Sequence, residues 1–73
     1  MLNWTEVGDS TMITAIAYDE GGETIYVRFK DGAEWWYAGC PPQVWEEFTR
    51  PGQSKGRYFH TVLKHKPQGE HSG

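Results

Sequence analysis

The segment Ser54, Lys55, Gly56 and Arg57 carries the residue types best suited to hold an anion. Ser54 is a predicted N-cap, and the first turn of a helix has backbone N–H groups without intrahelical partners. The two cations add positive charge, and Gly56 lets a ligand come close to the backbone. These residues form a candidate phosphate or RNA site, although an ordinary cap beside solvated cations is the commoner use of such a pattern.

Cys40 and the adjacent acids Glu46 and Glu47 are the candidates for catalysis. A thiol just before a helix can be activated by the helix N-terminus, but cysteine is more often a small buried residue. Neighbouring glutamates project in different directions from a helix and do not make a carboxylate pair. The sequence therefore predicts no catalytic residue and no enzyme.

Metal ligands are too few for a closed site. One cysteine with His60, His65 and His71 would reach four ligands only by recruiting the polar C-terminal residues, so we predict no metal and no cofactor. A single cysteine excludes an internal disulfide, which suits a reducing compartment. The N-terminus resembles no signal peptide and no apolar run could span a bilayer, so we expect a cytoplasmic protein without membrane contact.

Charge is unevenly distributed along a chain of net charge −3. The first 34 residues hold most of the acids, whereas the remainder is slightly basic. Nucleic-acid-binding proteins are normally basic, so the acidic half favours a basic protein partner. Asp19, Glu20 and Glu23 are the acids that we expect to steer such a partner, although solvated surface is the commoner explanation of charge runs.

The hairpin around Gly32 decides whether Tyr26, Arg28 and Trp36 share a face. A three-residue loop with Gly32 left-handed pairs Arg28 with Glu34 and Tyr26 with Trp36. A two-residue loop would turn Glu34 toward the apolar face, so we predict the three-residue loop. Tyr26, Arg28 and Trp36 then form an exposed patch suited to base stacking or to a protein contact. Alternatively, the N-terminal segment with its tryptophan folds over this patch as a minor core.

Apolar spacing defines the elements that position these residues. Alternation at a period of two predicts strands, and a period near 3.6 after the prolines predicts helices. The expected strands cover residues 11–18, 24–30 and 33–37, and the expected helices cover 42–50 and 54–64. The fold class is α+β: a three-stranded antiparallel meander, or a four-stranded one if residues 1–10 pair, packed against two short C-terminal helices. We assign residues 1–65 to one domain and 66–73 to a disordered tail.

At several apolar and glycine positions this chain resembles the KTSC domain, a short module named after the C-terminus of some lysyl-tRNA synthetases. The matching runs are Ile13-x-x-Ile16-x-Tyr18, Ile25-x-Val27-x-Phe29, Gly32, Trp35-x-Tyr37, Pro42-x-Val44-Trp45-x-x-Phe48 and Ser54-x-Gly56-x-Tyr58-Phe59. The resemblance covers about residues 7–65 and implies the family fold. Trp35 departs from the central Tyr-x-Tyr of the family, and His60 replaces a small amide. RNA binding is suspected for the family.

A free-standing acidic chain of 73 residues, rich in tryptophan, also resembles a phage-encoded protein that binds host bacterial RNA polymerase. That resemblance implies a protein of the host bacterial cytoplasm that contacts the N-terminal region of the β′ subunit, inhibits initiation and promotes antitermination. We expect the chain to be a monomer. An RNA-binding module for tRNA or single-stranded RNA is the alternative. The residues expected to contact the partner are Asp19, Glu20, Glu23, Tyr26, Arg28 and Trp36.

Overall fold

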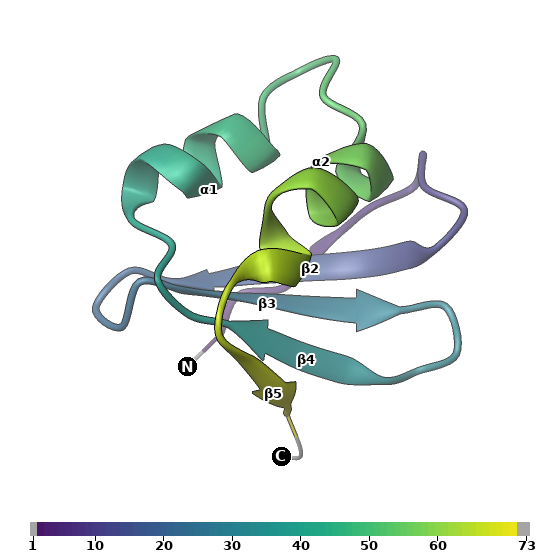
Figure 1. Cartoon of the computed structure of the whole chain (residues 1–73). Helices are drawn as coiled ribbons and strands as arrows, with labels where there is room; N and C mark the ends of the chain where they lie inside the picture. Colours follow the sequence, from purple (N-terminus) through teal and green to yellow (C-terminus); the bar gives the residue numbers. More distant parts are fainter. Residues whose placement is uncertain (1, 72–73) are drawn as a thin grey trace.

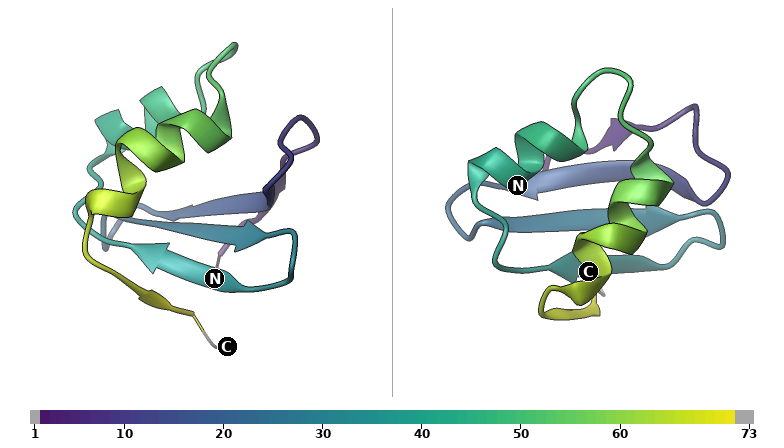
Figure 2. Two further views of the ribbon diagram at one scale, coloured as in Figure 1. Left: turned by 45° about the vertical axis from the view of Figure 1, so that its right-hand side comes forward. Right: turned by 45° about the horizontal axis from the view of Figure 1, so that its top comes forward.

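The computed structural model describes residues 2–71, which form an antiparallel sheet with helices on one side (Figure 1). The sheet has five strands in chain order: β1 (Thr5–Glu6), β2 (Ile13–Asp19), β3 (Thr24–Phe29), β4 (Glu34–Tyr37) and β5 (Gln68–Glu70). The helices are α1 (Pro42–Phe48) and α2 (Lys55–Thr61), followed by the 3-10 turn η1 (Leu63–His65). Both views of Figure 2 place this helical layer on one face of the sheet. We call the other face, which none of the described helices covers, the open face.

The predicted α+β class is confirmed, but the predicted strand count of three or four is wrong. β1 adds one edge of the sheet, and β5 adds the other within the segment that we expected to be disordered. β5 is held by backbone pairing rather than by apolar side chains, which is why composition did not reveal it. The N–H of Ala38 donates to the carbonyl of Pro67 at 2.8 Å, and the N–H of His71 donates to that of Glu34 at 2.7 Å. Residues 72 and 73 of the predicted tail lie outside the described residues.

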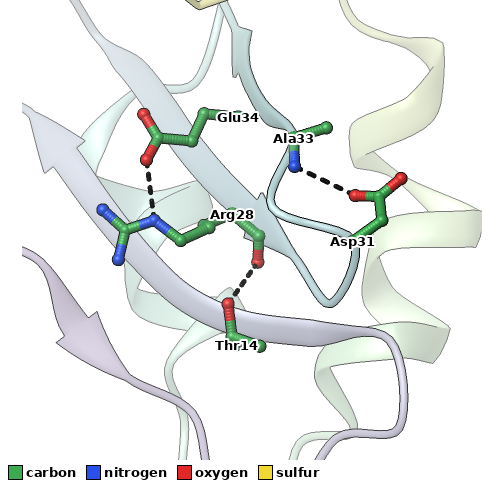
Figure 3. Close-up of polar contacts among 5 residues, drawn as sticks. All are labelled: Thr14, Arg28, Asp31, Ala33 and Glu34. Atoms are coloured by element: carbon green, nitrogen blue, oxygen red, sulfur yellow. Dashed lines mark hydrogen bonds and ion pairs between the residues drawn. The ribbon is translucent and has the colours of Figure 1, made fainter.

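The predicted register of the β3–β4 hairpin is confirmed. Tyr26 pairs with Trp36, and Arg28 pairs with Glu34. Gly32 has φ of 93°, the left-handed conformation that the three-residue loop requires. The Asp31 carboxylate accepts a hydrogen bond from the Ala33 N–H at 2.9 Å and closes the loop (Figure 3).

The core lies between the sheet and the helices, because alternate strand residues project toward the helical layer. Phe48 and Tyr58 are the buried residues of α1 and α2. Ser54 caps α2 as predicted, and its side chain accepts a hydrogen bond from the Arg57 N–H at 3.3 Å. The buried core residues are Ile13, Ile16, Ile25, Val27, Tyr37, Cys40, Phe48, Tyr58 and Leu63.

Two buried tyrosines predict a loss of stability at high pH. Burial raises the pKa of Tyr37 to about 12, and burial together with a hydrogen bond to Glu47 raises the pKa of Tyr58 to about 12. An unfolded chain loses tyrosine protons from about pH 10, so the folded state holds more protons between about pH 10 and 12. The contribution of the two tyrosines to the free energy of unfolding should therefore be constant below this window and fall as pH rises through it.

Urea denaturation at a series of pH values measures this loss. Tyr37→Phe is the control, because no hydrogen bond from the Tyr37 hydroxyl is found among the described residues and the substitution removes one titrating group. The variant should show a shallower decline than the wild type. Equal slopes in the two proteins would contradict the assignment to Tyr37.

Candidate functional site

Two rows of side chains cross the open face, each formed by residues paired across neighbouring strands. One row contains Ala17, Tyr26, Trp36 and Gly69. The next row contains Ala15, Arg28 and Glu34, and His71 continues it beside Glu34. The register therefore brings Tyr26, Arg28 and Trp36 together, as predicted.

Arg28 is held in place by an aromatic ring on one side and a carboxylate on the other. Its Nε donates to Glu34 Oε2 at 2.7 Å, and its guanidinium carbon lies 4.4 Å from the centre of the Trp4 ring. The Arg28 carbonyl accepts a hydrogen bond from Thr14 Oγ1 at 3.2 Å (Figure 3). The N-terminal segment thus reaches the open face through Trp4, and the positive charge of Arg28 is already paired.

Trp36 lies over the backbone of β5. A Cβ atom at Gly69 would come within 2.5 Å of Trp36 Cζ2, closer than packed atoms approach one another. The indole is therefore spread across Gly69 while the Trp36 side chain keeps part of its surface exposed. The sequence analysis did not predict this contact. The one feature of the sequence that indicates it is a glycine, Gly69, in a segment without apolar side chains.

The β2–β3 turn places acids beside an aromatic hollow on the open face. Asp19 and Glu20 line this hollow together with Leu2, Tyr26 and His71. The His71 ring stands edge-on to the Tyr26 ring, with centres 4.9 Å apart and planes at 70°. Two of the predicted steering acids thus share a concave site with a predicted aromatic contact.

Glu23 lies in the same turn, and its backbone carbonyl connects the turn to the segment that precedes α1. Its φ of 49° is left-handed, which is uncommon for a residue other than glycine. Its carbonyl accepts a hydrogen bond from the Cys40 N–H at 2.8 Å, while its side chain is exposed. The turn therefore presents the predicted trio of acids at one end of the sheet.

The Ser54–Arg57 segment is not brought to this face. It begins α2, which packs on the opposite face of the sheet (Figure 1). Ser54, Lys55 and Gly56 border a separate hollow, which Asp9 also lines. The stacking residues and the basic residues of the RNA hypothesis therefore lie on opposite sides of the domain.

The residues considered for catalysis are buried in the core or lie on helix α1. Cys40 is 0% exposed, and burial raises the pKa of its thiol, an effect that Lys66 partly offsets. Glu47 accepts a hydrogen bond from the Tyr58 hydroxyl at 2.9 Å and so joins α1 to α2. Glu46 is exposed on α1. A buried thiol with a raised pKa is a poor nucleophile at neutral pH.

We expect the Cys40 thiol to be protected in the folded protein. A thiol-specific reagent should label it at least about a thousandfold more slowly in buffer than in denaturant, because labelling must await an opening of the core. The time course of a coloured disulfide reagent measures both rates. Rapid labelling of a chain that retains its native fluorescence would contradict the buried position.

Within residues 2–71, no group of three or more His, Cys, Asp or Glu side chains is arranged to hold a metal ion. None of the described helices is both long and apolar enough to cross a membrane.

Comparison with known proteins gives consistent matches along most of the chain. The model of the KTSC domain family matches residues 9–66. A protein of Tsukamurella paurometabola is 30% identical over 56 residues, which are 77% of this chain and 82% of that protein. The crystal structure of a KTSC domain protein from Yersinia pestis superposes with a TM-score of 0.88 at 25% identity, covering 99% of this chain and all of that one.

Proposed function

The chain belongs to the KTSC domain family, and from that premise we propose that it is a binding protein that docks on bacterial RNA polymerase through the open face of its sheet. Membership of a family with this fold does not assign an activity, so the proposal has to come from the site. The observation that carries it is the hollow in which Asp19 and Glu20 meet the Tyr26 ring. Carboxylates at the rim of an aromatic surface suit a basic segment of a protein.

The open face supplies the parts of a protein-docking surface. Tyr26 and Trp36 are partly exposed and held by their neighbours, and rigid aromatic side chains are the usual anchors of interfaces. The exposed acids of the β2–β3 turn add negative charge at the rim, where charges mainly raise the rate of encounter.

We propose the N-terminal region of the β′ subunit as the partner because the chain is similar to the phage-encoded protein in length, acidity and tryptophan content. A basic region of an enzyme that handles nucleic acid would complement the acidic turn. Inhibition of initiation and promotion of antitermination need no catalysis by the bound protein. A ligand shifts the equilibrium between polymerase conformations by its difference in affinity for them.

Capture of bacterial RNA polymerase on the tagged protein, in the presence of nuclease, tests the proposal. Polymerase retained after nuclease treatment supports a direct protein contact. Loss of the polymerase after this treatment would overturn the proposal.

Charge reversal of the acidic turn should weaken polymerase binding. Glu20→Lys/Glu23→Lys is expected to lower affinity about tenfold at low salt, because it replaces attraction by repulsion at the rim. Neither side chain makes a hydrogen bond among the described residues, so the fold should persist. Titration of labelled protein with polymerase measures the change at two salt concentrations.

Asp9→Lys/Glu46→Lys is the matched control, since it changes net charge equally at exposed acids away from the β2–β3 turn. The control should keep most of the affinity. An equal loss in the two variants would show that net charge, rather than the acidic turn, governs the encounter.

RNA binding is the second candidate, and the aromatic open face favours it. Single-stranded nucleic acid stacks its bases on exposed aromatic side chains of a sheet, and Tyr26 and Trp36 are side by side in one row. Lys55 and Arg57, however, lie with the helical layer, so one short strand would not touch both sets. This candidate predicts affinity for single-stranded RNA that falls steeply with salt and is weakened by Arg57→Glu.

A further inference from the structure

On the open face, the guanidinium group of Arg28 is held between an aromatic ring and a carboxylate. Arg28 lies against the Trp4 ring at 4.4 Å and pairs with the Glu34 carboxylate at 2.7 Å. Arginine suits this arrangement because its planar group stacks on aromatic rings while its N–H groups bond a carboxylate.

The hollow beside the β2–β3 turn offers an aromatic ring and carboxylates of the same kind, but among the described residues no lysine or arginine side chain lies in it. Tyr26 supplies an aromatic ring, Asp19 and Glu20 supply carboxylates, and the His71 ring stands at 70° to that of Tyr26. Within residues 2–71, neither acid forms an ion pair. The concave site, of about 520 Å³, is large enough for one long side chain.

We infer that this hollow receives the side chain of an arginine from the partner protein. The inference rests on the proposed function of the open face as a partner-binding surface and names the group recognised there. The guanidinium stacks on Tyr26, and the Glu20 carboxylate accepts its N–H groups. Asp19 stays tied to the turn, where its Oδ1 accepts a hydrogen bond from the Gly22 N–H at 3.3 Å. Leu2 and His71 close the sides around the aliphatic part of the side chain.

Titration of the intact protein with two short peptides tests this inference. Acetyl-Gly-Arg-Gly-amide carries the guanidinium, and the citrulline peptide has the same shape without the charge. Amide and ring NMR signals report the site. The arginine peptide should shift the signals of Gly21, Tyr26 and His71, with an affinity about tenfold higher than that of the citrulline peptide. Equal affinities, or shifts confined to other residues, would overturn the inference.

Two variants with the same chemical change separate the hollow from general charge. Glu20→Gln should reduce the affinity for the arginine peptide severalfold, because the variant keeps the shape of the side chain and loses its charge. Glu46→Gln, on the helical layer, should leave that affinity unchanged. Equal losses in both variants would contradict a site at the hollow.

The peptide titration tests the arginine site and the polymerase capture tests the proposed function, so a negative result in one does not decide the other. Polymerase retained without any arginine-peptide shift would leave the proposed function standing and remove the arginine site. Arginine-peptide binding without polymerase retention would keep the site and require a different basic partner.

Discussion

Replacing Phe48 by alanine is expected to lower the free energy of unfolding by about 3–5 kcal/mol. Phe48 is 0% exposed and lies between the two helices, with its ring centre 6.2 Å from that of Trp45 and 5.5 Å from that of Tyr58. Its removal leaves a cavity where both helices meet the core. A domain of this size has about 4–11 kcal/mol of stability at the usual values per residue, so the variant should be largely or partly unfolded.

Phe48→Leu separates the loss of volume from the loss of the aromatic ring. Leucine keeps much of the apolar volume, so the expected cost is about 1–2 kcal/mol, well below that of alanine. Urea denaturation followed by tryptophan fluorescence measures both variants. A loss below about 1 kcal/mol for Phe48→Ala would show that the helices pack without this residue.

The central hairpin could be predicted because local turn chemistry and apolar alternation agree there. Gly32 supplies the left-handed residue, and the resulting register buries Ile25 and Val27 while pairing Arg28 with Glu34. The two-residue loop, which shifts the register by one residue, would have turned Glu34 toward the core. Agreement between local and overall requirements is what makes such an element readable from sequence.

β5 could not be predicted because its stability does not come from its own side chains. Gln68–Glu70 pairs through its backbone with the free edge of β4, and Gly69 fits because it has no Cβ. Amino-acid composition does not indicate a strand of this kind. Propensity scales treat such a segment as coil, while its pairing depends on residues far away in the chain.

Of the candidate site, the part that lies on the β3–β4 hairpin could be predicted from the sequence. Pairing across β3 and β4 follows from the hairpin, so Tyr26 and Trp36 were assigned to one face. One of the two alternatives placed the N-terminal tryptophan over this patch, and Trp4 does lie against Arg28 there. The contributions of Leu2 and His71 come from the ends of the chain and depend on β1 and β5. Sequence spacing carries no information on where such terminal segments return to a sheet.

The second large effect is expected at Gly69, where alanine should displace either Trp36 or β5. The added Cβ would lie 2.5 to 2.9 Å from three atoms of the indole, and real packing does not allow such contacts. We expect a loss of stability of about 1–3 kcal/mol, the usual cost of overpacking. Under the proposed function, polymerase affinity should fall about tenfold or more, because the variant removes the ordered position of a proposed aromatic anchor.

NMR resolves this effect, since the four tryptophans give four indole N–H signals. In Gly69→Ala the Trp36 signal should move, and the amide of Ala38, which bonds to Pro67, should exchange faster with solvent. Gly8→Ala is the matched control, because a Cβ at Gly8 meets no atom within 4 Å. The control should leave the Trp36 signal and the polymerase affinity unchanged.

Combining Gly69→Ala with Trp36→Ala tests the cause directly. Without the indole, the added methyl group at residue 69 no longer meets the three atoms nearest to it, so protection of the Ala38 amide should return in the double variant. Two changes that act through one contact give a combined effect smaller than their sum. Additive losses would show that Gly69 is required by the β5 backbone itself, and the contact with Trp36 would then not explain why glycine stands at this position.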